Sequence, residues 1–223
     1  MPWACESDPE RDLRDNTAMA DEFTGFTRDA FSFWKGLEQH NNRDWFQAHR
    51  DTYEQAVRRP MQLLVEELRP LYGPGKLSRI NKDMRFAKEK PYKNYLATGL
   101  AGCYISFSKQ GLWVGSGMYK PEAAALRQLR EAIAADSSGK ELTTIISSLR
   151  RKGFDVDTHA RLAAPPRGYD AKHPRAELLC MKDIFAGKLF GPAEVSSAKV
   201  LNGVVKAMRD VEPFRQWLRE HVA

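Results

Sequence analysis

The fold is decided by Cys103-Tyr104-Ile105-Ser106-Phe107-Ser108, the loop Lys109-Gln110-Gly111 and the run Leu112-Trp113-Val114-Gly115. Both flanking runs are rich in β-branched and aromatic residues, which pack well on the surface of a sheet. Two such runs that are joined by a short loop with a glycine are typical of a β-hairpin. The stretch therefore predicts an antiparallel sheet in the middle of the chain.

Helical patterns precede this hairpin. Apolar residues recur at helical spacing from Ala30 to Leu37, which predicts a short helix. A second helix is expected to begin near Arg43 with Asn41-Asn42 as break and cap, to be interrupted at Pro60 and to run on to Pro70.

Helical patterns also follow the hairpin. Further helices are expected over residues 121–135, 140–151, 193–208 and 213–221, with Pro121 at the first helical position and Ser137-Ser138-Gly139 as a break. Residues 153–175 have the composition of a loop, and residues 177–190 fit either a strand or a helix. The fold class that follows is α+β, a helix-rich single domain with a small antiparallel β-sheet.

The first 21 residues differ from the rest of the chain. They are polar, contain two prolines and lack hydrophobic periodicity, so we expect a disordered N-terminal tail over 1–21 and a single domain over 22–223. A chain of 223 residues is long enough for a single core to be stable on its own.

The composition bounds the function. The 35 basic and 29 acidic residues give a net charge of +6, which attracts anions but is small for a dedicated nucleic-acid-binding protein. The three cysteines, Cys5, Cys103 and Cys180, form no CxxC pair, and no histidines have metal-site spacing, so neither a metal site nor a cofactor is predicted. Because no apolar run reaches the roughly 20 residues of a membrane span and no signal segment opens the chain, we expect a cytoplasmic protein without a membrane partner.

The segment from Arg79 to Tyr92 is the main candidate site. On a strand, Arg79, Asn81, Asp83 and Arg85 would share one face, and two arginines on one face suit a phosphate or a carboxylate. Candidate ligand-binding residues are Arg79, Asp83, Arg85, Lys90 and Tyr92, together with Arg43 and Arg50 of the preceding helix. The alternative is a structural network in which the same arginines pair with Asp83.

The glycines of Gly115-Ser116-Gly117 are a second, weaker candidate. Glycines between a strand and a helix expose backbone N–H groups that bind anions, so Gly115 and Gly117 are candidate ligand-binding residues. The alternative is a tight turn that requires positive φ.

No catalytic residue can be assigned from the sequence. There is no GxSxG motif, and no cysteine has an evident histidine partner. His173, between Lys172 and Pro174 in a loop, is a candidate general base, with a turn residue as the alternative.

The ordered motifs resemble those of the DUF2461 family of uncharacterised bacterial proteins. The resemblance spans about Phe23 to Val222, and in the basic motif Lys82 stands where the family usually has arginine, and Glu89 where it usually has Asp or Asn. It implies a shared fold and a shared site but supplies no activity. The residues that carry it are Arg79, Lys82, Asp83, Arg85, Phe86, Glu89, Lys90 and Tyr92, the upstream block Asn41–Phe46 with Arg50 and Tyr53, and the downstream block Gly115–Pro121.

Two functions follow from these features. In the first, a basic cleft binds a small phosphorylated or carboxylated ligand, with or without catalysis. In the second, the protein is a binding module for nucleic acid or an acidic protein, and the same cations continue into an exposed strip. That strip would include Lys109, Lys120, Arg127 and Arg130.

Overall fold

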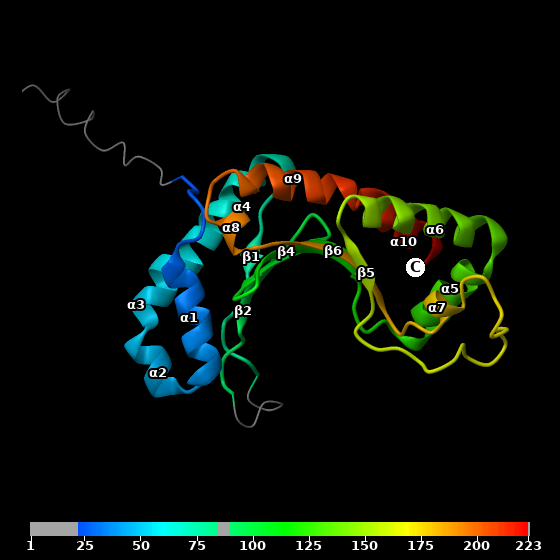
Figure 1. Ribbon diagram of the computed structural model, residues 1–223, viewed down its shortest axis with the longest axis horizontal. Coiled ribbons are helices and arrows are strands. Elements are labelled where there is room, and N and C mark those ends of the chain that lie inside the picture. The colour runs from blue at the N-terminus through cyan, green and yellow to red at the C-terminus, as the bar shows by residue number, and fades with distance from the viewer. Residues whose placement is uncertain (1–21, 84–89, 223) are drawn as a thin grey trace, which may run out of the picture.

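The computed structural model describes residues 22–83 and 90–222 of the chain. These residues form the α+β domain that the sequence predicts, and its sheet has six strands (Figure 1). The elements in chain order are α1 (Arg28–Gln39), α2 (Arg43–Ala48), α3 (Arg50–Thr52), the π-helix η1 (Tyr53–Arg58), α4 (Arg59–Tyr72), β1 (Lys76–Leu77), β2 (Tyr95–Leu100), β3 (Cys103–Ser108), β4 (Gly111–Met118), α5 (Ala123–Ala134), α6 (Asp136–Arg151), β5 (Asp155–Asp157), α7 (Ala176–Leu179), β6 (Ile184–Phe190), α8 (Pro192–Val195), α9 (Val200–Asp210) and α10 (Glu212–His221).

The sheet is antiparallel throughout, in the order β1-β2-β3-β4-β6-β5. The predicted hairpin is confirmed as β3 and β4, which turn at the pair Ser108 and Gly111. Residues 177–190 contain both alternatives, since the short helix α7 comes before strand β6. The sequence reading missed β2 and β5, and β5 lies in a stretch that was expected to be a loop.

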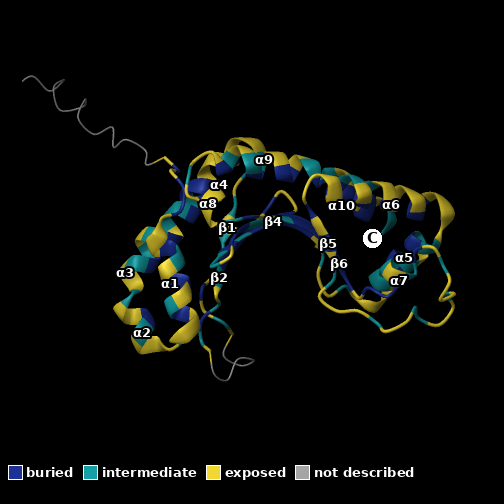
Figure 2. Ribbon diagram, viewed as in Figure 1, coloured by how far each residue is buried: buried dark blue, intermediate teal, exposed yellow. Residues whose placement is uncertain are grey.

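The sheet is bent into an arch whose two faces differ (Figure 1). Along β3 the side chains of Cys103, Ile105 and Phe107 are buried, whereas the alternating residues lie on the other, more exposed face. Helices α8, α9 and α10 pack against β4, and Phe26, which precedes α1, stacks on Phe107. Figure 2 shows buried positions along β4 and on the side of α9 that faces the sheet. The hydrophobic core therefore lies on the convex side of the arch.

The N-terminal helices follow the sequence signals with one change. Asn42 caps α2, because its side chain accepts a hydrogen bond from the Trp45 amide at 2.9 Å. The expected interruption at Pro60 takes the form of the π-helical turn η1, and the helical path continues through the proline into α4. A proline lacks an amide hydrogen, and the change of hydrogen-bond pattern at this junction accommodates it. Helix α4 then ends at Gly73, whose φ of 78° stops the helix.

Three other local predictions were wrong. Residues 79–83 form no strand of the sheet, and only Asn81 makes an isolated bridge, to Tyr92. Helix α5 begins at Ala123 after its N-cap Glu122, so Pro121 precedes the helix. The predicted break at Ser137-Ser138-Gly139 lies inside α6, and the chain breaks at Ala135 instead.

The predicted tail, 1–21, lies outside the described residues. Within the described residues, no helix is both long and apolar enough to cross a lipid bilayer.

Candidate functional site

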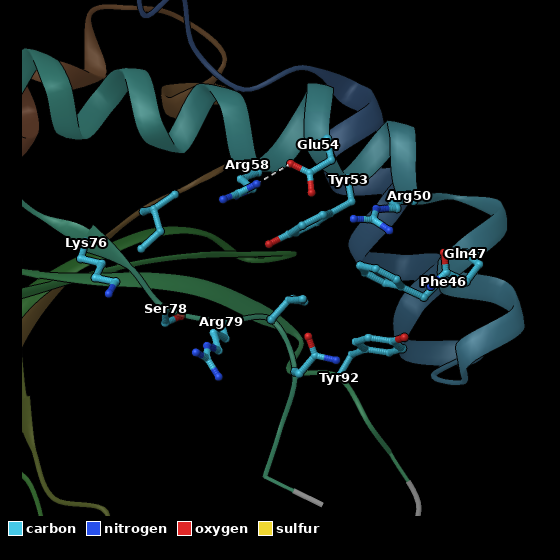
Figure 3. Close-up of a pocket in the computed structure, with 13 residues that line it drawn as sticks. Phe46, Gln47, Arg50, Tyr53, Glu54, Arg58, Lys76, Ser78, Arg79 and Tyr92 are labelled. Atoms are coloured by element: carbon cyan, nitrogen blue, oxygen red, sulfur yellow. Dashed lines mark hydrogen bonds and ion pairs between the residues drawn. The ribbon is translucent and has the colours of Figure 1, made fainter.

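A cleft of about 410 Å³ opens between η1 and the segment that runs from β1 to Asn81 (Figure 3). The helical side supplies Arg50, Tyr53 and Arg58, and the strand side supplies Lys76 and Arg79. The remaining lining residues are Phe46, Gln47, Glu54, Leu77, Ser78, Ile80, Asn81 and Tyr92.

Four cations and one carboxylate line this cleft. Arg58 is paired, because its guanidinium lies 2.9 Å from the carboxylate of Glu54. Among the residues that the structure describes, none forms an ion pair or hydrogen bond with the side chains of Arg50, Lys76 and Arg79. The cleft therefore carries an excess of positive charge that its own carboxylate does not balance.

Aromatic rings form the floor of the cleft. Phe46 stacks on Tyr92 with ring centroids 4.1 Å apart, and Tyr53 lies 5.4 Å from Phe46. Tyr53 is only 4% exposed, and burial, with a smaller contribution from Glu54, raises its pKa to about 12 although Arg58 opposes the shift. Its hydroxyl points into the cleft in Figure 3. At neutral pH Tyr53 is thus a neutral hydrogen-bond donor at the edge of a cationic site.

The strand side of the cleft is held in place by backbone contacts. The Lys82 amide donates to the carbonyl of Pro91, and the Lys93 amide donates to the carbonyl of Ile80, each at 2.8 Å. Asn41 joins this pair of segments to the start of α2, because its side chain exchanges two hydrogen bonds of 3.0 Å with the backbone of Tyr92. These contacts fix where Arg79 stands relative to Arg50.

Replacing Asn41 by alanine is expected to lower the free energy of unfolding by about 1–2 kcal/mol, because the backbone N–H and C=O of Tyr92 both lose a protein partner. Urea unfolding at neutral pH measures the loss. Asn42→Ala is the matched control, since it removes only the α2 cap and should cost about 1 kcal/mol. A loss of only a few tenths of a kcal/mol for Asn41→Ala would contradict the anchoring role.

The structure brings together some of the residues that the sequence singled out. Arg50, Arg79 and Tyr92 line the same cleft. Tyr92 contributes its ring to the floor, and Figure 3 shows its hydroxyl directed away from Arg79. Arg43, Asp83 and Lys90 are exposed and do not line the cleft, and Arg85 lies outside the described residues.

The turn that was predicted at Gly115-Ser116-Gly117 was wrong. Gly115 and Gly117 lie inside β4 and pair with Gly187 and Phe185 of β6, so they do not form a turn before a helix. A Cβ atom at either position would stand 2.3 Å from a carbonyl oxygen of β6. These glycines allow close strand packing and offer no helix N-terminus to an anion.

His173, Cys103 and Cys180 also fall outside the cleft. The Nδ1 atom of His173 accepts a hydrogen bond from the Arg175 amide at 3.1 Å, which is the role of a turn residue. Cys103 and Cys180 are free and buried. In the parts of the chain that the structure describes, no group of three or more His, Cys, Asp or Glu side chains could hold a metal ion.

Some lining residues had no signal of their own in the sequence. Lys76 and Ser78 follow the Gly73-Pro74-Gly75 turn, which returns the chain towards η1. Arg58 and Glu54 were not singled out, and their spacing of four residues is that of an ordinary pair on a helix surface. Only the tertiary fold shows that they face Arg79.

Comparison with known protein families identifies the family of this chain. The family model of the conserved hypothetical proteins called DUF2461 matches residues 29–217, a range that includes all six strands and every residue that lines the cleft. No curated protein matches the chain.

Proposed function

The chain belongs to the DUF2461 family, and from the geometry of its cleft we propose that the protein binds a small phosphorylated or carboxylated ligand there. Arg50, Lys76 and Arg79 would neutralise the anion. Guanidinium groups suit this task because they make two parallel hydrogen bonds to a phosphate or carboxylate.

One observation carries the proposal: three cations without an ionic partner among the described residues line one concave, aromatic-floored cleft. Ligand sites for small molecules are typically concave and mostly apolar, with a few polar groups that fix the ligand. The protonated hydroxyl of Tyr53 adds a neutral donor beside the cations.

The alternative, a surface for nucleic acid or an acidic protein, has less support. One cation of the supposed strip, Lys109, lies 2.6 Å from Glu38 and is already paired. A polyanion also prefers an extended row of cations to a pocket, since each phosphate that it binds releases counterions.

The test is a titration with three small anions, inorganic phosphate, phenyl phosphate and citrate, followed by calorimetry and thermal shift. A ligand at 100 times its Kd adds about 2.7 kcal/mol to stability, which a melting curve detects easily. We expect at least one of these anions to saturate the wild type and Arg79→Gln to raise its Kd about tenfold, the cost of one charge-assisted contact.

Arg127→Gln is the matched control, because Arg127 is an exposed arginine of α5 that does not line the cleft. It should leave anion binding unchanged. If none of the three anions saturates, or if both variants weaken binding equally, the cleft is not the anion site. Binding of single-stranded DNA that weakens steeply with salt and depends on Arg127 would support the alternative.

A further inference from the structure

A second cavity, of about 700 Å³, lies on the exposed concave face of the sheet. It shares no lining residue with the cleft. Its described lining contains aromatic rings, serines, glycine, a methionine and a histidine, with no Asp, Glu, Lys, Arg, Asn or Gln. A ligand in this cavity therefore meets ring faces and a few uncharged polar groups.

Trp113 of β4 forms the base of this cavity, and two glycines make room for its ring. Gly115 and Gly187 pair across β4 and β6. A Cβ atom at residue 187 would stand 1.9 Å from the indole, and one at residue 115 would stand 2.5 Å from it. The indole thus lies against the backbone of the sheet, and its opposite face remains for a ligand.

Other rings continue from Trp113 in both directions. Tyr104 lies 6.2 Å from Trp113, and Phe185 lies 6.1 Å from it, between ring centroids. His159 follows at 4.7 Å from Phe185, and Tyr119 at 5.0 Å from His159. Tyr104 and Tyr119 are among the most exposed large apolar side chains of the described residues. Trp113 and Phe185 are half-buried between them. A row of rings that is partly exposed to water is costly and marks a binding surface.

His159, between Phe185 and Tyr119 in this row, is held by a buried carboxylate. Its Nδ1 atom lies 3.1 Å from Asp183, which is 2% exposed and also accepts hydrogen bonds of 2.7 Å from the Thr158 hydroxyl and the His159 amide. Burial alone would raise the pKa of Asp183, but these hydrogen bonds outweigh it and lower that pKa below its usual value. Because an ionised carboxylate only accepts, the proton of a neutral His159 ring is on Nδ1, and Nε2 carries a lone pair.

We propose that this cavity binds a planar, uncharged heteroaromatic ring, which stacks on Trp113 and donates a hydrogen bond from a ring-edge N–H to Nε2 of His159. Stacking needs only an open ring face, and one acceptor at the edge of the cavity satisfies one donor of the ligand. A sugar fits less well, because the few serine and tyrosine hydroxyls and the one histidine of this lining are too few to replace the water around all of its hydroxyls.

The cavity is separate from the anion cleft, although the two are neighbours on one sheet. Lys76 pairs with Gly99, and Gly99 pairs with Tyr104, so Lys76 and Tyr104 share a face and lie two strands apart. At a spacing of about 4.8 Å between strands, their backbones are about 10 Å apart. The inference does not depend on the proposed anion site, and an uncharged probe tests it alone.

The probes are guanosine and uridine, each of which has a ring N–H, and adenosine and cytidine, which have none, titrated while the tryptophan fluorescence of the protein is recorded. We expect saturable quenching by guanosine or uridine, and about tenfold weaker binding after Trp113→Leu, as expected for the loss of one stacking partner. Arg79→Gln is the control and should leave nucleoside binding unchanged, which separates this inference from the anion proposal. Calorimetry replaces fluorescence for Trp113→Leu, and circular dichroism confirms that the variant is folded.

His159→Phe tests the hydrogen bond, because it keeps a ring and removes Nε2. It should weaken the binding of guanosine or uridine about tenfold, and it should not affect the same nucleoside methylated at that ring nitrogen, which should already bind weakly. Absence of saturation for both guanosine and uridine at millimolar concentration overturns the inference. The inference is also overturned if Trp113→Leu leaves nucleoside binding unchanged, or if His159→Phe weakens the binding of the methylated and unmethylated nucleosides equally.

Discussion

Replacing Arg175 by methionine is expected to lower the free energy of unfolding by about 3 kcal/mol, because one buried and one partly buried carbonyl each lose a hydrogen bond. Arg175 is 7% exposed, and its guanidinium donates to the carbonyls of Ile133, Ala134 and Ala135 at 2.5, 2.9 and 3.1 Å. These carbonyls end helix α5, where the last turn has no intrahelical donors. The Ala135 carbonyl also accepts a hydrogen bond from the Gly139 amide, so the loss of stability comes mainly from the carbonyls of Ile133 and Ala134.

Methionine keeps most of the volume of the arginine stem, so the measured loss reports the missing donors rather than a cavity. Urea unfolding at neutral pH gives the value. Arg175→Lys is the control, because lysine retains the charge and part of the donor capacity, and its loss should lie between those of wild type and Arg175→Met. A loss under 1 kcal/mol for Arg175→Met would mean that water satisfies these carbonyls.

Arg175 also explains a wrong prediction from the sequence. Ser137-Ser138-Gly139 looked like a break between helices, yet all three residues lie in α6. A Cβ atom at residue 139 would stand 2.2 Å from the carbonyl oxygen of Ile133 and 2.4 Å from Nε of Arg175, so glycine is needed there for close packing. The glycine signal was real, but its cause is this packing and not a break in the helix.

The features that were predicted correctly depend on residues close together in the sequence, and those that were missed depend on contacts that only the tertiary fold makes. The β3–β4 hairpin and the Asn42 cap depend on residues close in sequence, and both were predicted. Gly115 was misread because its requirement comes from β6 and from the ring of Trp113, which crosses it on the sheet surface. Local patterns report local geometry, and they cannot tell a glycine that turns the chain from one that makes room for a ring.

The residues of the candidate sites also divide into those that the sequence indicated and those that only the fold brings together. Charge density alone pointed to Arg50 and Arg79, and these two line one cleft. Nothing in the spacing of His159 and Asp183 indicated a pair, since 24 residues separate them and the fold alone brings Nδ1 to the carboxylate. Asn41 was expected only to break or cap a helix, whereas its side chain binds the backbone of Tyr92.

Stability is expected to fall as the pH rises from 10 to 12, and Tyr53 is expected to contribute about 3 kcal/mol of that fall. Burial raises the pKa of Tyr53 from 10.0 to about 12 in the folded protein. Below pH 10 the tyrosine is protonated in both states, and its contribution is fully present. Between pH 10 and 12 the unfolded chain has lost the proton and the folded protein has kept it, so each pH unit costs about 1.4 kcal/mol.

The difference between wild type and Tyr53→Phe isolates this contribution, because lysines and the other tyrosines titrate in both proteins. Urea unfolding at intervals from pH 9 to 11.5 should show a steeper decline for the wild type, and a difference between the two that is constant below pH 10. Parallel curves over the whole range would mean that the phenolate of Tyr53 reaches water without unfolding. In that case Tyr53 would also be an anion near pH 10, and its repulsion would weaken phosphate binding in the cleft well before the protein unfolds.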